Sequence, residues 1–338
     1  PSQRVRSHAV DQTNRRQELS VVNTVKESNQ TKSLPLICLV GPTAVGKSGI
    51  ALKLADQLNA EIINADSRQF YKELHIGTAK PTREERDKVP HHLIDCASIT
   101  QPWSVGQFVT AADEAIKQIR NKQKVPMLVG GTGLYFRSLA FGLSAIPEVS
   151  AEVKNTVQQR CEKEGLASLY FELAKIDPQW AGDLSPHDTQ RILRAFEVYV
   201  QTGKSLREFW RNDPRQRRYE HLSFCLTQDR KMLYDRINDR VWLMLEQGLK
   251  QEALDLWTQY PQNEILRTTI GYAEWAKYGG DGDGAVRDKI QQNTRRFAKR
   301  QLTWFRKEAE IKWIEVTTAQ AAIEKILTCT KKELPKGL

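Results

Sequence analysis

The chain has 338 residues, of which 27% are charged and 8% aromatic, enough for a sizeable core, and its net charge of +10 hints at a polyanionic partner without excluding a merely basic protein. The longest uncharged apolar run, residues 34–40, is far shorter than the ~20 residues that a membrane-spanning helix needs, so we expect no membrane segment. The five cysteines are scattered without C-x-x-C spacing, which argues against a disulfide framework or a zinc site and favours the cytoplasm.

Short apolar strands alternate with helices over the first part of the chain, after a polar segment at 1–33 that we expect to be a flexible tail. Strands are predicted at 36–40, 61–65 and 127–129. This alternation predicts a parallel α/β sheet. The helix after the first strand has its apolar residues at i, i+3, i+4 and i+7: Ala51, Leu54, Ala55 and Leu58. The helix before the third strand begins at the N-cap Ser104 and is expected to bury Phe108, Ala112, Ala115 and Ile119.

The strands stop after Leu143, and helices take over. Two helices are predicted at 151–163 and 166–175. A third is marked by Ser185 as N-cap, Pro186 in the first turn, Asp188 near the positive end and Gly203 beyond its last residue, with a buried stripe of Ile192, Phe196 and Tyr199. A strand at 222–226, a long helix at 231–260 and a last strand at 311–316 follow. We therefore expect an α/β core of residues 34–145 and 221–338, interrupted by a helical insertion at 146–220.

A phosphate-binding motif lies between the first strand and the helix that follows it. The sequence Gly41-Pro-Thr-Ala-Val-Gly-Lys-Ser48 matches G-x-x-x-x-G-K-[ST] without a gap. Such a loop turns its backbone N–H groups toward phosphate oxygens, Lys47 adds a positive charge, and Ser48 would hold Mg²⁺. The expected fold class is therefore an α/β, P-loop NTPase-like parallel sheet. The residues expected to bind a diphosphate are Gly41, Thr43, Ala44, Val45, Gly46, Lys47 and Ser48.

The carboxylate that a nucleotide hydrolase or kinase places at the end of a later strand is missing from the third strand, which runs into Gly130, Gly131 and Thr132. A carboxylate, Asp66, instead follows the second strand. Since the carboxyl ends of parallel strands face the same crevice, we expect Asp66 and Thr132 to converge on the phosphate loop. The alternative is that Asp66 is a solvated loop residue.

Several motifs together resemble the tRNA dimethylallyltransferase family in their order and spacing. They are G-P-T-A-V-G-K-S, N-A-D-S-R-Q-F-Y-K-E-L-H-I-G-T-A-K-P, H-H-L-I-D, G-G-T-G-L-Y, D-T-Q-R-I-L-R-A, I-G-Y and N-T-R-R-F-A-K-R-Q-L-T-W-F-R, and the similarity extends over residues 34–316. The Cys/His spacing of a C-terminal zinc finger is absent, which favours the bacterial type of this family.

The resemblance implies that the chain transfers the dimethylallyl group from dimethylallyl diphosphate to N6 of the adenosine 3′-adjacent to the anticodon in tRNA, and that diphosphate is the leaving group. Asp66 would accept the proton of the amine. Lys47, the loop amides, Mg²⁺ on Ser48 and Thr132 would neutralise the departing charge. Arg236, on the predicted long helix, is a candidate second cation, and its alternative role is that of a solvated arginine. The implied partners are dimethylallyl diphosphate and the anticodon stem-loop of tRNA, and we expect a cytoplasmic monomer.

An adenosine that is flipped out of an anticodon loop requires a basic surface to hold that loop. Arg191 and Arg194 fall opposite the buried stripe of their helix, and Arg296, Arg300 and Lys307 share one face of the late helix, of which Phe297 and Trp304 can bury another. A solvated cationic face has the same pattern. Lys154 stands where relatives often have an arginine, so an ammonium group takes the place of a guanidinium that could bind phosphate through two hydrogen bonds. The residues expected to bind tRNA are Asp66, Ser67, Arg68, Gln69, Thr132, Lys154, Gln190, Arg191, Arg194, Arg267, Gly271, Tyr272, Arg295, Arg296, Lys299 and Arg300.

Three rival functions share parts of this pattern. An isopentenyltransferase acting on AMP, ADP or ATP would need the phosphate loop and Asp66, but neither the basic helix nor the insertion. A small-molecule kinase would need the missing strand-end aspartate. An RNA-binding protein with an inactive phosphate loop would not need Lys47, Ser48 and Asp66 to be intact.

Overall fold

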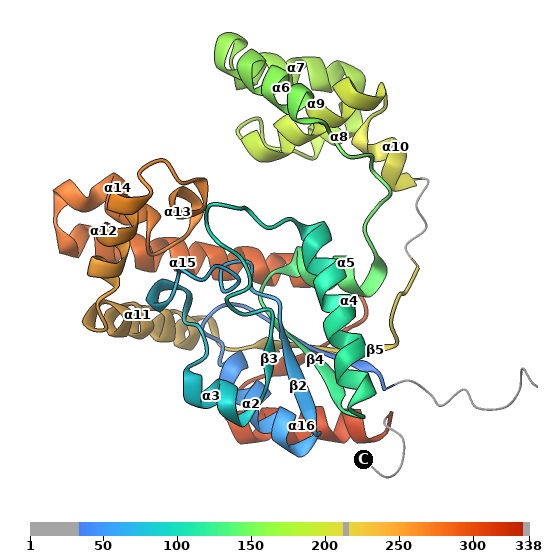
Figure 1. The fold of residues 1–338 in the computed structure, drawn as a ribbon, viewed down its shortest axis with the longest axis vertical. Coiled ribbons are helices and arrows are strands. Elements are labelled where there is room, and N and C mark those ends of the chain that lie inside the picture. Colours follow the sequence, from blue (N-terminus) through green and yellow to red (C-terminus); the bar gives the residue numbers. More distant parts are fainter. Residues whose placement is uncertain (1–33, 212–215, 334–338) are drawn as a thin grey trace, which may run out of the picture. The chain divides into compact units, whose positions relative to one another are not determined.

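The structure, a computed structural model, describes residues 34–211 and 216–333, so the expected polar tail at 1–33 lies outside the described residues. One sheet of six parallel strands in the order β3-β2-β4-β1-β5-β6 confirms the predicted fold class (Figure 1). The chain divides into two compact units, and the first holds the whole sheet. The strands are β1 Leu36–Val40, β2 Ala60–Asn64, β3 His91–His92, β4 Val125–Gly130, β5 His221–Thr227 and β6 Ile311–Glu315.

The centre of the sheet consists of strands that are apolar along their length. All five residues of β1 are buried, and β1 lies between β4 and β5, which explains its continuous Leu-Ile-Cys-Leu-Val run. The strand predicted at 36–40 is therefore confirmed at both ends. The strands predicted at 61–65, 127–129, 222–226 and 311–316 are also present, with ends that differ by one or two residues.

The helices of the first unit pack on the sheet and on one another. α2 (Lys47–Gln57) and α16 (Ala319–Lys331) pack together below the sheet in Figure 1, where Leu54, Phe224 and Ile323 belong to one core cluster. The other helices of this unit are η1 Ile76–Thr78, α3 Arg83–Lys88, α11 Arg230–Glu246, α12 Leu249–Gln259, α13 Glu264–Thr268, α14 Ala273–Tyr278, η2 Gly279–Asp281 and α15 Asp283–Phe305. A second cluster, which includes Val241, Tyr272 and Val286, joins α11, α12, α14 and α15.

The start of α4 (Val105–Asn121) follows directly from two side chains. Ser104 Oγ accepts a hydrogen bond from the Gln107 N–H (3.2 Å), and Gln107 Oε1 accepts one from the Ser104 N–H (2.9 Å). This reciprocal pair satisfies two backbone donors that a helix start leaves without partners. The predicted N-cap is confirmed, as is the buried stripe of Phe108, Ala112, Ala115 and Ile119.

The single long helix predicted at 231–260 is wrong, because α11 ends at Glu246 and α12 begins at Leu249. Gly248 between them has a φ of +100°, in the left-handed region that a residue without a Cβ adopts easily. Its N–H donates to the carbonyl of Leu245 (3.1 Å) and closes α11. Apolar residues recur on both sides of the break, so periodicity alone does not reveal it.

The second unit comprises Gln101–Asp113 and Thr132–Glu220, so it is larger than the insertion expected at 146–220 and also includes α5. Val157, Leu173 and Phe196 belong to its core cluster. Its helices beyond α4 are α5 Gly133–Phe141, α6 Ala151–Glu164, α7 Leu166–Ile176, α8 Pro178–Gly182, α9 Thr189–Thr202 and α10 Leu206–Arg211. Across residues 34–211 and 216–333, no helix combines the length and apolar character needed to cross a membrane.

α9 begins later than predicted, because Asp188 and not Ser185 is its N-cap. The Asp188 carboxylate accepts from the Arg191 N–H (3.2 Å), whereas Ser185 and Pro186 form a turn in which Ser185 Oγ accepts from the His187 N–H (3.3 Å). Gly203 ends the helix in the left-handed conformation, as predicted. Ile192 and Phe196 are buried, but Tyr199 is only half-buried, since Ala195 and Val198 complete the buried face.

Candidate active site

The phosphate loop connects β1 to α2 and lies against the end of β5. Gly41 has a φ of +144°, and a Cβ there would lie 2.7 Å from the carbonyl oxygen of Leu226. Only glycine therefore fits at this position. The loop ends at Gly46, the N-cap of α2, and Lys47 and Ser48 are the first two residues of that helix. The backbone N–H groups at this helix start have no partner within the helix and are suited to an anion.

Lys47 is held over the loop by two backbone carbonyls. Its Nζ donates to Gly41 O (3.0 Å) and Pro42 O (2.8 Å), which leaves one of three ammonium donors for a ligand. Desolvation lowers the pKa of Lys47 to about 8, although the negative charge of Asp66 opposes that shift. A desolvated ammonium of this kind is stabilised by an anion that binds beside it.

Two arginines of α11 also reach the loop. A Cβ on Gly46 would lie 3.2 Å from Nη2 of Arg236, so this exposed guanidinium, a predicted site residue, borders the loop directly. Arg240 is one turn further along and was not predicted. Its Nη2 donates to Thr43 Oγ1 (2.6 Å), while its Nε is buried with no hydrogen-bond partner among the described residues. Burial lowers the pKa of Arg240, and the charge of Asp66 counteracts this effect.

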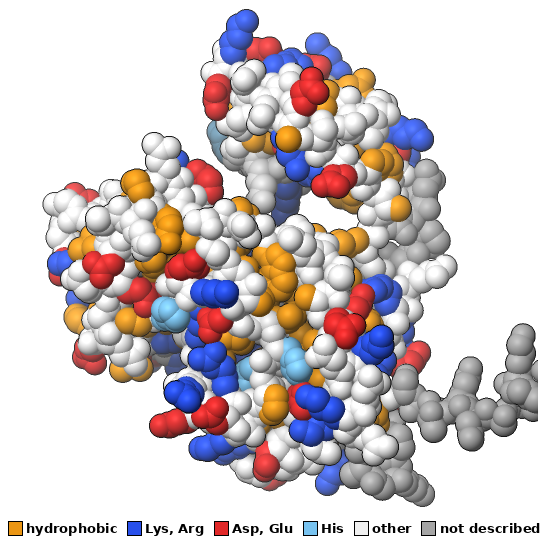
Figure 2. All heavy atoms as spheres, in the orientation of Figure 1, with side chains coloured by type: hydrophobic (Ala, Val, Ile, Leu, Met, Phe, Trp, Pro, Cys, Tyr) orange, Lys and Arg blue, Asp and Glu red, His pale blue; other side chains and the backbone are white. Residues whose placement is uncertain are grey.

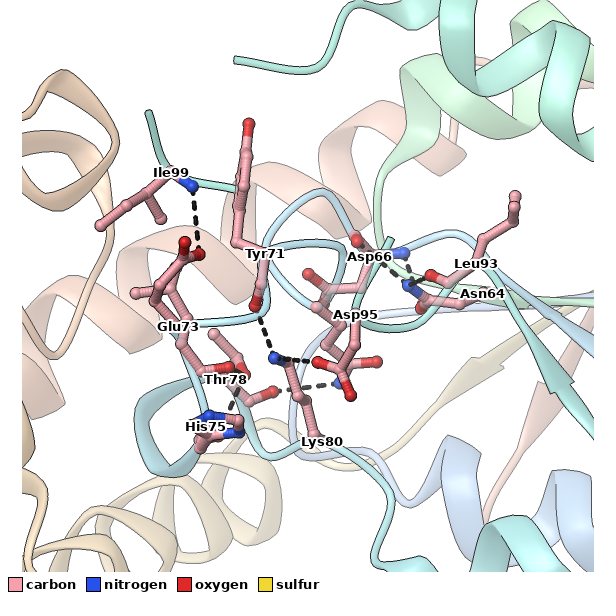
Figure 3. Close-up of polar contacts among 12 residues, drawn as sticks. Asn64, Asp66, Tyr71, Glu73, His75, Thr78, Lys80, Leu93, Asp95 and Ile99 are labelled. Atoms are coloured by element: carbon pink, nitrogen blue, oxygen red, sulfur yellow. Dashed lines mark hydrogen bonds and ion pairs between the residues drawn. The ribbon is translucent and has the colours of Figure 1, made fainter. Parts of the chain in front are cut away.

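Asp66 follows β2 at the carboxyl edge of the sheet (Figure 3). Its Oδ1 accepts from the Arg68 N–H (2.9 Å), which fixes the carboxylate in a local turn. Its negative charge opposes the lowering of the pKa of both Lys47 and Arg240 by burial, so the carboxylate lies close enough to interact with both cations. Thr132, the N-cap of α5, belongs to the second unit, whereas Asp66 belongs to the first. The convergence of Thr132 with Asp66 therefore stays a prediction.

Gln301 of α15 is a second residue that sequence reasoning missed. This side chain is buried, accepts from the Thr43 N–H (2.8 Å) and donates to Gly131 O (2.9 Å). It therefore joins the phosphate loop to the end of β4. Its place within K-R-Q-L-T-W, one of the motifs of the late helix, was the available signal.

Some of the residues expected to bind tRNA surround a pocket of about 220 Å³ in the first unit, with Arg267, Glu274, Asn293 and Arg300 in its lining. Glu274 is buried and accepts from the Gly271 N–H (2.8 Å) and from Asn293 Nδ2 (2.7 Å). This carboxylate therefore has backbone and side-chain donors of its own, and the cations that line the pocket are Arg267, Lys277 and Arg300.

Other expected contacts are occupied within the protein. Tyr272 is fully buried, donates to the Glu252 carboxylate and accepts from the Gly77 N–H (3.2 Å). Desolvation and Glu252 raise the pKa of this phenol, which remains a donor. A direct contact of the Tyr272 side chain with RNA is incompatible with its burial. The Gln69 amide donates to Thr78 O (3.0 Å), and Arg295 is half-buried and donates to Asn238 Oδ1 (2.6 Å).

On α15 the predicted cationic face is exposed, but the predicted apolar face is wrong. Phe297 and Trp304 are only half-buried, because the face that packs inward carries Ile290, Thr294, Ala298, Gln301 and Phe305. Lys307 is exposed just past the helix end. Most of the other residues expected to bind tRNA are exposed, namely Arg296, Lys299, Arg300, Lys154, Arg191 and Gln190. Three are half-buried, namely Arg194, Ser67 and Arg68.

Several of these cations have partners at the surface. Arg68 Nη2 donates to Thr268 Oγ1 (3.1 Å), Arg191 lies 3.5 Å from Asp188, and Arg194 lies 3.6 Å from Glu197. Figure 2 shows Lys and Arg side chains interspersed with Asp and Glu over the face that it displays. The net charge of +10 therefore does not form one unbroken basic patch on that face.

The residues at the phosphate loop could hold Mg²⁺ only together with a bound phosphate group, as in other phosphate-loop enzymes. No group of three or more His, Cys, Asp or Glu that could hold a metal occurs among residues 34–211 and 216–333. Ser48 is exposed beside Lys47 at the start of α2, so it offers one hydroxyl. Mg²⁺ commonly takes one or two protein ligands and completes its shell with phosphate oxygens and water. Ser48 would hold the ion together with a bound diphosphate.

Comparisons with known proteins agree with one another. The sequence model of the family described as IPP transferase matches residues 69–308. The tRNA dimethylallyltransferase of Salinibacter ruber is 43% identical over 291 residues, which are 85% of this chain and 89% of that protein. That of Bacillus subtilis is 40% identical over 293 residues, which are 86% and 93%.

Solved structures are similar as well. The tRNA isopentenylpyrophosphate transferase of Bacillus halodurans is 36% identical with a TM-score of 0.65, and the match covers 88% of this chain and 97% of that protein. A eukaryotic dimethylallyltransferase acting on tRNA is 27% identical with a TM-score of 0.76, over 90% and 81%.

Proposed function

The chain belongs to the IPP transferase family and has tRNA dimethylallyltransferase activity, and we propose that it moves the dimethylallyl group from dimethylallyl diphosphate to N6 of the adenosine 3′-adjacent to the anticodon. The observation that carries this proposal is that Asp66 follows β2 and the phosphate loop with Lys47 follows β1, at the same carboxyl edge of one parallel sheet. A base and a set of anion-binding groups are thereby held at one edge of the sheet. A cytoplasmic location and a monomeric state stay predictions.

In the proposed reaction, a bond forms between N6 of the adenosine and C1 of the dimethylallyl group while the C1–O bond breaks. The electron pair of the broken bond leaves with the diphosphate, and the N6 proton passes to Asp66. Loop amides, Lys47, Arg236 and Arg240 stabilise the negative charge that develops on the diphosphate. Mg²⁺ held by Ser48 would add positive charge to the same group. Thr132 is proposed as a further hydrogen-bond donor to the leaving oxygen.

Surface cations of each unit are proposed to contact the anticodon stem-loop of tRNA. In the first unit these are Arg267, Arg296, Lys299 and Arg300, of which Arg267 and Arg300 line the 220 Å³ pocket. In the second unit they are Lys154 and Arg191, which are exposed, and Arg194, which is half-buried. Guanidinium groups suit this role because they bind phosphate in a fork and stack on unpaired bases.

The test is a transfer assay with labelled dimethylallyl diphosphate, Mg²⁺ and either unmodified tRNA or AMP. We expect label in an anticodon-loop adenosine of tRNA and little in AMP. Comparable label in AMP would instead favour an adenine-nucleotide isopentenyltransferase. Binding of tRNA with no transfer under any condition would overturn the proposed chemistry.

A further inference from the structure

We propose that Asn64 is a positioning residue for Asp66: its buried amide binds both the N–H and the carbonyl of Asp66 and joins them to the loop at 93–95. The inference rests on the proposed function, in which Asp66 is the base. Asn64 itself would touch neither substrate.

The geometry around Asn64 is specific. Asn64 is the last residue of β2 and is 3% exposed. Its Oδ1 accepts from the Asp66 N–H (3.0 Å), and its Nδ2 donates to Asp66 O (3.3 Å) and to Leu93 O (3.0 Å). Figure 3 shows the Asn64 amide between Asp66 and Leu93. Both polar groups of the Asp66 backbone are therefore held by one side chain.

This grip decides where the Asp66 carboxylate lies. Oδ1 of Asp66 is engaged by the Arg68 N–H (2.9 Å), so Oδ2 is the oxygen available to an incoming amine. With one carboxylate oxygen fixed to the turn, a shift of the Asp66 backbone moves the other oxygen by a similar amount. Misplacement of a reacting group by about 1 Å lowers rates by up to about 100-fold.

The loop at the far end of this link is itself well held. Leu93 and Asp95 have φ values of +62° and +54°, in the left-handed region, which is unusual for a residue such as leucine and less so for aspartate. The Asp95 carboxylate accepts from Lys80 (2.6 Å) and Arg86 (2.9 Å), and the Asp95 N–H donates to Gln69 O (3.3 Å). Asn64 therefore links the backbone of Asp66 to a loop that is itself held by several hydrogen bonds.

The first experiment compares Asn64→Ala with wild type in single-turnover prenyl transfer at saturating tRNA and dimethylallyl diphosphate. We expect the rate to fall about 10- to 100-fold, as is typical when a residue that orients a reactive group is removed. KM for both substrates should change less than about twofold, since Asn64 binds neither of them.

The matched control is Asn263→Ala, because Asn263 also donates to a carbonyl, Ile99 O (2.8 Å), and accepts from a backbone N–H, that of Leu266 (3.0 Å). The control should lose stability and retain the saturated rate.

A double-mutant cycle then separates this inference from the proposed function. If Asn64 acts through Asp66, adding Asn64→Ala to Asp66→Ala should lower the rate no further. An undiminished rate in Asp66→Ala alone would remove the base and the inference together. A slow Asp66→Ala with a normal Asn64→Ala, or additive losses in the double variant, would overturn the inference and leave the function standing.

Should Asn64→Ala fail to fold, Asn64→Ser provides the same test. Its hydroxyl can accept from the Asp66 N–H in a serine turn but cannot reach Leu93 as the amide does. We expect a rate between those of wild type and Asp66→Ala, with unchanged KM. A wild-type rate in Asn64→Ser together with reduced stability would mean that the link to Leu93 is structural only.

Discussion

At the scale of single residues, Lys47 connects the pH of the solution to substrate binding. Desolvation lowers its pKa to about 8, and only the protonated ammonium attracts a diphosphate. Because the proton is lost as the pH rises through that value, KM for dimethylallyl diphosphate should increase above about pH 8. Lys47→Arg, whose guanidinium stays charged, should flatten this rise even if its overall rate is lower. A wild-type KM that is constant from about pH 7 to 9.5 would contradict the assignment.

Arg240 and Arg236 form a matched pair for a second residue-scale prediction. Arg240 is half-buried and bonded to Thr43, whereas Arg236 is exposed beside Gly46. Replacing Arg240 by Gln removes a preorganised donor in a water-poor site and should lower kcat by about 100-fold. Arg236→Gln should have a smaller effect, because water screens its charge. Steady-state kinetics at saturating tRNA measure both, and equal losses would mean that burial does not distinguish the two arginines.

At the scale of elements, the edge of the sheet is joined by an ion cluster around Glu61, the second residue of β2. Glu61 is 1% exposed and lies 2.8 Å from His92 of β3, 3.1 Å from Lys122 and 3.0 Å from Lys124. Burial alone would raise the pKa of Glu61, but hydrogen bonds from His92, Lys124 and Lys122 lower it to about 2.

A carboxylate whose folded-state pKa is depressed stabilises the fold above its unfolded pKa, and this contribution is lost as the pH falls through the folded value. The window for Glu61 therefore runs from about 4.5 down to about 2. Glu61→Gln should be clearly less stable than wild type at neutral pH, and the difference should narrow across that window. Urea unfolding of both proteins at several pH values measures this difference in the free energy of unfolding. A difference that is independent of pH would exclude the charge of Glu61 as the cause.

At the scale of the whole molecule, the sequence pattern predicted those features that depend on interactions between residues close together in the chain. The buried run of β1 and the stripe of α4 follow from periodicity and capping, which act over a few residues. The break at Gly248 was missed because apolar residues recur on both sides of it, and the cap at Asp188 was missed because Ser185, three residues earlier, is an equally suitable N-cap residue. Contacts such as Arg240 to Thr43, or Gln301 to Gly131, join positions far apart in the chain and leave no local pattern. For the same reason Tyr272 was assigned to RNA and is instead part of the core.

The distribution of charge leads to the last prediction, which concerns tRNA binding as a whole. Since basic and acidic side chains are interspersed on the face shown in Figure 2, affinity should depend on particular cations and not on net charge alone. Arg296→Ala with Arg300→Ala should weaken tRNA binding and reduce the slope of log affinity against log salt by about 1.5, at roughly 0.7–0.9 for each phosphate that is no longer neutralised. The matched control is Arg83→Ala with Lys88→Ala on α3, which removes the same charge from exposed positions outside the proposed interface. If the two double variants reduce the slope equally, binding follows net charge, and α15 has no special place in the interface.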